Sequence, residues 1–135
     1  MFLKYNWPGL LWLLVILALT GFPGNYFPRV TSFWYWLGPD KIVHLFIFGI
    51  LTWLLLRGFH KQSRFRNLQS HYIIYALIIG IIFGALTEVM QRYIFIGRNA
   101  NVYDFLANLS GCIIGLIAYY LVNRKLSKNI RILDN

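Results

Sequence analysis

Four long runs of apolar residues constrain the fold of this chain more than any other feature. They extend over about residues 7–22, 42–56, 72–96 and 105–122. A helix needs about 20 apolar residues to cross a bilayer, with a range of about 17–25. The third and fourth runs reach that length, whereas the first two need flanking residues or a thinned bilayer. The sequence therefore predicts an all-α polytopic membrane protein, a four-helix bundle forming one domain over residues 1–135.

The composition supports a membrane protein and argues against binding to nucleic acid. Hydrophobic residues make up 59% of the chain and charged residues only 13%, whereas ordinary soluble domains carry roughly 25% charged residues. The net charge is +9, but the basic residues concentrate in short segments beside apolar runs, which is typical of membrane topology. The single cysteine, Cys112, excludes an intramolecular disulfide and a multi-cysteine metal site.

The basic residues also predict an orientation. Most of them lie before the first run, between the second and third runs, and in a basic tail over residues 123–135. In a four-helix chain these segments share one side, which the positive-inside rule assigns to the cytoplasm. We therefore expect both termini in the cytoplasm, with the protein in a bacterial cytoplasmic (inner) membrane. The alternative for the first run, which Lys4 precedes, is a cleaved signal peptide.

The connection between the first two runs is rich in aromatic residues. It reads FPGNYFPRVTSFWYWLGP over residues 22–39. Aromatic side chains favour the membrane–water interface, so an interfacial belt is the preferred interpretation. The alternative is an apolar platform for a lipid or an amphiphilic ligand.

Polar residues line up with small residues on the predicted helices. Helical spacing puts three sets each on one face: Asp40 and His44; Gly80, Gly84, Glu88 and Arg92, with Gln91 alongside; and Asp104, Asn108, Gly111 and Gly115. Small residues let helices approach closely, so these faces should meet inside the bundle. The polar residues would then form one pocket near the outer membrane surface, where burial demands partners.

Each polar residue also has a purely structural alternative. Asp40 and Asp104 are plausible helix N-caps. Glu88 and Arg92 suit a surface ion pair, which contributes little. Gln91 and Asn108 suit hydrogen bonds between helices. Convergence of so many polar groups at one membrane depth favours the functional pocket.

These residues resemble the VanZ-like family of small bacterial membrane proteins. The family pattern is carried by DKIVHLFIFGIL, GALTEVMQR and GRNANVYDFLANLSGCIIG, over about residues 39–122. The matching positions are Asp40, Lys41, His44, Glu88, Gln91, Arg98, Asp104, Asn108 and Gly111. The resemblance implies a multi-span membrane protein related to low-level resistance against the glycopeptide teicoplanin. It implies no settled reaction, and the cofactor stays unknown.

The preferred hypothesis for function is an envelope-facing binding site without catalysis. Lys41, Arg92 and Arg98 would hold an anionic group of a membrane lipid or an envelope lipid precursor, since arginine suits bidentate phosphate contacts. The aromatic connection would pack against an acyl chain or a lipophilic glycopeptide. The sequence leaves the oligomeric state open.

An intramembrane enzyme acting on such a lipid is the first alternative. His44 would serve as general base, with Asp40 orienting it or Glu88 acting as acid. An oxygen- and nitrogen-rich metal site is another version, and its candidate ligands are Asp40, His44, Glu88 and Asp104. The sequence contains no HExxH, GxSxG or P-loop motif, so catalysis is the weaker hypothesis.

A small dimeric transporter is the last alternative. Small multidrug exporters place an essential glutamate near mid-membrane in their first helix. In this chain Glu88 lies near the outer end of the third helix, and the first apolar run contains no ionisable residue. Access from both sides of the membrane is hard to reconcile with that placement.

Overall fold

The computed structural model describes residues 2–21, 38–94 and 101–133. They form five helices: α1 (Phe2–Thr20), α2 (Pro39–His60), α3 (Arg66–Ser70), α4 (Tyr72–Tyr93) and α5 (Val102–Leu133). Four of them are long and apolar enough to cross a membrane. The prediction of an all-α chain with four membrane spans is therefore confirmed. Nearly all of the aromatic connection lies outside the described residues.

The helices extend beyond the apolar runs that predicted them. The first two have 19 and 22 residues, long enough to span without a thinned bilayer, because the polar flanks continue the helices. α5 has 32 residues and ends at Leu133, whereas the fourth apolar run predicted a helix that ends near residue 122. No glycine or proline interrupts residues 123–133, and their Lys, Arg and Leu are good helix formers.

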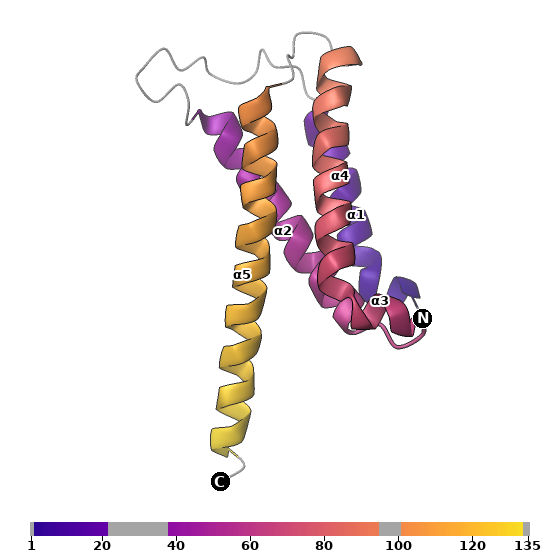
Figure 1. The fold of residues 1–135 in the computed structure, drawn as a ribbon, viewed down its shortest axis with the longest axis vertical. Coiled ribbons are helices and arrows are strands. Elements are labelled where there is room, and N and C mark those ends of the chain that lie inside the picture. Colours follow the sequence, from indigo (N-terminus) through magenta and orange to yellow (C-terminus); the bar gives the residue numbers. More distant parts are fainter. Residues whose placement is uncertain (1, 22–37, 95–100, 134–135) are drawn as a thin grey trace.

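Helix α2 is the central element of the bundle. It packs most extensively against α5 and also contacts α1 and α4, and it runs obliquely across the bundle in Figure 1. The start of α1, helix α3 and the C-terminal end of α5 lie at one end of the molecule (Figure 1). Both termini therefore lie on the same side. Their assignment to the cytoplasm stays a prediction.

The core forms around the buried face of α2, while the outside of the bundle is apolar. Phe48, Leu51 and Leu56 on α2 are fully buried, together with Ile16 of α1 and Ala76 of α4. Many large apolar side chains elsewhere on α1, α4 and α5 are exposed. An apolar surface all round is what a lipid environment requires, since charged side chains there are costly.

Glycines set the distance between α2 and α5. A Cβ atom added at Gly111 would collide with the carbonyl oxygen of Leu45, and one at Gly115 with that of Gly49. Backbone therefore lies directly against backbone, an approach that only glycine permits.

Two glycines of α4 face α5 in a looser contact. A Cβ at Gly80 would lie 2.9 Å from Cys112 Sγ, and one at Gly84 would lie 3.2 Å from Asn108 Cβ. The four glycines singled out in the sequence thus lie at helix interfaces. Gly49, which completes the contact with α5, was not among them.

Candidate functional site

Buried polar residues gather where α2 and α5 begin and α4 ends. This is the end of the bundle opposite the two termini (Figure 1). His44, Glu88, Gln91, Asp104 and Asn108 are all buried, and Asn108 is only 1% exposed. Three helices therefore bring together residues that lie 64 positions apart in the chain, as the stripes of polar residues predicted.

A chain of hydrogen bonds links His44 to Glu88 through Asn108. His44 Nδ1 lies 2.9 Å from Asn108 Oδ1, and Asn108 Nδ2 donates to Glu88 Oε1 over 3.4 Å. The backbone N–H of Asn101 donates to the other carboxylate oxygen, Oε2, over 3.4 Å. His44 Nδ1 also lies 3.9 Å from Glu88 Oε1. Both carboxylate oxygens thus accept a hydrogen bond, as burial requires.

A lysine lies between two aspartates beside this chain. Lys41 Nζ is 3.1 Å from Asp104 Oδ1 and 3.4 Å from Asp40 Oδ2. The side chains of Lys41 and Asp104 are 11% and 9% exposed, whereas that of Asp40 is 41% exposed. Lys41 therefore neutralises carboxylates of the protein rather than standing free for a ligand.

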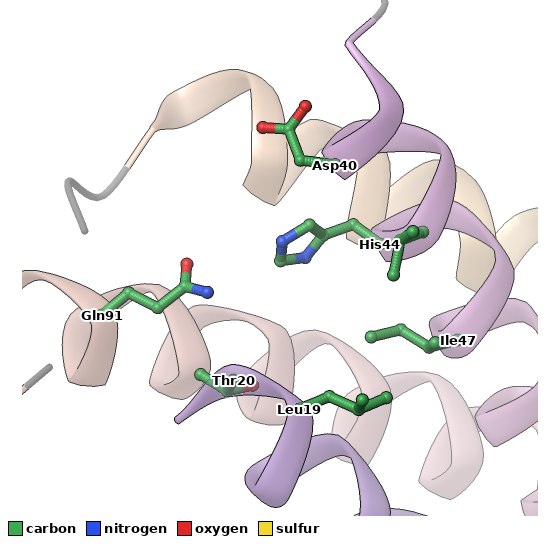
Figure 2. Close-up of a pocket in the computed structure, with 7 residues that line it drawn as sticks. Leu19, Thr20, Asp40, His44, Ile47 and Gln91 are labelled. Carbon is green, nitrogen blue, oxygen red and sulfur yellow. The ribbon is translucent and has the colours of Figure 1, made fainter. Parts of the chain in front are cut away.

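A small cavity opens between α1, α2 and α4. Its volume is about 40 Å³, and it is lined by Leu19, Thr20, Asp40, Val43, His44, Ile47 and Gln91. The His44 imidazole and the Gln91 amide point into it from opposite sides (Figure 2). Gln91 is 2% exposed, and its Nε2 is buried without a hydrogen-bond partner among the described residues. The cavity has room for at least one water-sized group.

The residues that cap α2 and α5 are not Asp40 and Asp104, which the sequence offered as N-caps. Gly38 precedes α2, with a proline in its first turn and no side-chain cap. Asn101 caps α5, because its Oδ1 accepts a hydrogen bond from the Tyr103 N–H over 3.0 Å. The N-cap interpretation of Asp40 and Asp104 is therefore wrong, since both carboxylates contact Lys41 instead.

Asn101 is thus a site residue that sequence reasoning missed. It caps the start of α5, and its backbone N–H donates a hydrogen bond to the Glu88 carboxylate. The sequence does contain a signal for this cap. An asparagine is followed three residues later by an acid, Asp104, which is similar to the capping-box pattern at helix starts.

Replacing Asn101 by alanine should lower the free energy of unfolding by about 1 kcal/mol, within the usual range for a lost N-cap. The substitution removes the partner of the Tyr103 N–H but keeps the backbone N–H that binds Glu88. The measurement is equilibrium unfolding in detergent. Asn101→Ser is the matched control and should keep most of the stability, since serine also caps helices. Equal losses in the two variants would contradict the capping role.

Arg92 does not join the pocket. Its side chain is exposed, and its guanidinium lies 5.5 Å from the ring centre of Tyr93. A stripe with four-residue spacing turns about 40° at each step of a 3.6-residue helix. Arg92 lies two such steps after Gly84, so its side chain has turned away from the helix interface. Near a membrane surface, a guanidinium is also more stable when its long side chain lets it reach water. Arg98 lies outside the described residues.

The four candidate metal ligands do not form one cluster. Among the residues that the structure describes, no group of three His, Cys, Asp or Glu side chains is placed to hold a metal ion. Asp40 and Asp104 contact the Lys41 ammonium, while His44 and Glu88 are linked through Asn108. The four candidates thus fall into two separate groups, and the Lys41 ammonium already supplies a positive charge between the two aspartates.

The fold and the buried polar cluster define a multi-pass α-helical membrane protein with a polar site at one end. The family model described as VanZ/LLP1 matches residues 9–123. The chain therefore belongs to this family, and the resemblance found in its sequence is confirmed.

One similar protein is the "Uncharacterized protein C11E3.10" of Schizosaccharomyces pombe, a fission yeast. It is 30% identical over 93 residues, which cover 69% of this chain and 54% of the relative. The chain thus spans about half the length of that relative. No solved structure matches this chain significantly.

Proposed function

We propose that this protein binds a cell-envelope lipid or lipid-linked precursor and takes up the end of its headgroup in the cavity between Gln91 and His44. Binding at the extracytoplasmic side of the membrane would change the envelope and thereby the susceptibility to glycopeptides of the teicoplanin type. The observation that carries the proposal is Gln91 Nε2, which is buried and has no hydrogen-bond partner among the described residues. An unsatisfied buried donor is costly, so its retention beside a cavity favours a ligand that completes its hydrogen bonds.

The charges around the cavity restrict the ligand chemistry. The ammonium of Lys41 is held by two carboxylates, and the guanidinium of Arg92 lies over Tyr93. Neither side chain lines the cavity, where the hypothesis from the sequence required a positive charge for a phosphate. The described part of the cavity offers an amide, an imidazole and Asp40 instead. A neutral polar part of a headgroup suits this lining better than a phosphate does.

The organism in which the similar protein occurs indicates which lipids the ligand could be. A protein similar to this chain occurs in a fission yeast. A ligand common to bacterial and eukaryotic membranes is therefore favoured over one confined to bacterial cell-wall synthesis. A glycerol or sugar headgroup fits that breadth, and its hydroxyls could bind the polar groups of the cavity, which are Asp40, His44 and Gln91.

Substitutions in the cavity test the proposed function in a teicoplanin-sensitive bacterial host. Wild-type protein should raise the minimal inhibitory concentration of teicoplanin severalfold, and Gln91→Leu or His44→Ala should abolish that increase. Arg92→Ala is the matched control on α4, because its side chain is exposed, and it should behave like the wild type. Lipids retained by each purified variant should be identified by native mass spectrometry. Full tolerance in well-folded Gln91 and His44 variants would overturn the proposal.

A second candidate function is catalysis on the bound lipid, and the orientation of His44 favours it. A general base needs a partner that orients it. Asn108 contacts Nδ1 of the imidazole, which leaves the other ring nitrogen for a ligand in the cavity. Incubation of purified protein with an envelope lipid extract separates the two functions. A product that requires His44 would establish the enzyme, whereas retention of intact lipid would establish binding alone.

A further inference from the structure

We propose that the cavity between Gln91 and His44 takes up a hydroxyl group. This group would donate its hydrogen bond to His44 Nε2 and accept one from the Gln91 amide. The inference rests on the proposed function and deepens it, because it names the chemical group of the ligand that enters the cavity. The hydrogen bonds from Glu88 to His44 have defined directions, and these directions determine which group the cavity can accept.

The first step is the direction of the Asn108 amide. Two donors, the Asn101 N–H and the Asn108 Nδ2–H, are directed at the Glu88 carboxylate. A carboxylate only accepts hydrogen bonds, and only the nitrogen of an amide side chain donates them. Turning the Asn108 amide over would place its oxygen against a carboxylate oxygen. Glu88 therefore holds Asn108 with its oxygen facing His44.

The second step is the proton on His44. Asn108 Oδ1 lies 2.9 Å from His44 Nδ1. Because this oxygen only accepts, Nδ1 must carry the hydrogen. In a neutral imidazole the other nitrogen is then an acceptor. His44 Nε2 makes no hydrogen bond with any residue in the described ranges, so its lone pair is available to a ligand.

The third step is the match across the cavity. Figure 2 shows the Gln91 amide facing the His44 imidazole, and Gln91 Nε2 is a donor without a partner among residues 2–21, 38–94 and 101–133. A hydroxyl both donates and accepts, so it satisfies the two sides together. An unprotonated phosphate only accepts and an ammonium only donates. Asp40 also lines the cavity, but Lys41 contacts its carboxylate.

The size of the cavity agrees with this assignment. A volume of about 40 Å³ admits one or two water-sized groups rather than a whole headgroup. The hydroxyl is therefore either that of a water molecule or the end of a longer ligand, such as a glycerol or sugar headgroup. Both sources present the same chemistry to His44 and Gln91.

Nitrogen NMR of ¹⁵N-histidine-labelled protein in lipid nanodiscs tests the inference. The signals of His44 are assigned by their loss in His44→Gln, since His60 and His71 remain. We expect a protonated Nδ1 and an unprotonated Nε2 whose chemical shift shows that it accepts a hydrogen bond. A protonated Nε2, or an Nε2 shift typical of a nitrogen without a hydrogen bond, would overturn the inference.

Two lipid compositions separate the sources of the hydroxyl. Phosphatidylcholine has no hydroxyl in its headgroup, whereas phosphatidylglycerol has two. A lipid hydroxyl would move the Nε2 signal between the two nanodiscs, and Gln91→Glu, which is isosteric but offers a carboxylate, would abolish that change. Water would give the same hydrogen-bonded Nε2 signal in both nanodiscs. Either result supports a hydroxyl in the cavity.

The experiments distinguish failure of the hydroxyl inference from failure of the proposed function. Suppose that native mass spectrometry finds a lipid whose retention depends on Gln91, but Nε2 of His44 is protonated. The proposed function then stands and the hydroxyl inference fails. If Nε2 accepts a hydrogen bond but no lipid is retained, the hydroxyl belongs to water and the proposed function fails.

Discussion

Replacing Lys41 by methionine is expected to lower the free energy of unfolding by about 3–5 kcal/mol, the usual effect of removing one partner from a buried ion pair. The substitution keeps the length of the side chain and removes the ammonium that lies 3.1 Å from Asp104 Oδ1. Asp104 is then buried as a carboxylate without a countercharge. Equilibrium unfolding in detergent measures the effect, which should be among the largest of any single polar substitution in the chain.

The double substitution Lys41→Met with Asp104→Leu is the decisive companion experiment. It removes both charges together, and replacing a buried pair by apolar residues is often neutral or stabilising. Most of the lost stability should therefore return. Lys61→Met is the matched control at an exposed position, where the change should be within about 0.5 kcal/mol. A single Lys41 variant as stable as that control would show that the ion pair does not hold α2 to α5.

Gly111→Ala is expected to lower the free energy of unfolding by about 3 kcal/mol, at the upper end of the usual cost of overpacking. The added methyl group would collide with the carbonyl oxygen of Leu45, which belongs to the backbone of α2 and has no alternative rotamer. Helix α5 must then move away from α2, and Asn108, one turn earlier on α5, would move with it. The variant should therefore also lose the teicoplanin tolerance that the proposed function predicts.

Gly9→Ala is the matched control for this experiment. It adds the same methyl group to a transmembrane helix, but the nearest atom is Leu55 Cδ2 at 3.2 Å, the end of a flexible side chain. Alanine is also the better helix former, so the net change should be small. Equal stability of the two variants would show that α2 and α5 do not need backbone contact.

The residue pattern was sufficient to predict that His44, Glu88 and Asn108 meet. His44, Glu88 and Asn108 were brought together by helical spacing alone, and the structure links them by hydrogen bonds. The reason is that a membrane restricts both the backbone conformation and the direction of polar side chains. Backbone groups must be paired within each helix, and polar side chains must turn inward to find partners.

Details within one turn of a helix could not be predicted in the same way. Arg92 shares the spacing of Glu88 but is exposed, because the stripe drifts around the helix by a fraction of a turn. Lys41 was assigned to a ligand, yet it lies between Asp40 and Asp104. Which of several nearby opposite charges pairs with which depends on distances of a few ångströms, and these are set by the packing of α2 against α5.

The sequence by itself thus determined the four apolar helices, the family and the end of the bundle where polar residues gather. The helices and their polar faces follow from the length of the apolar runs and from helical periodicity, which are local properties of the chain. Only the tertiary structure decided the direction of the hydrogen bonds through Asn108, the partners of Lys41 and the cavity between Gln91 and His44. Those depend on how closely the helices approach, which the glycine contacts between α2 and α5 set in three dimensions.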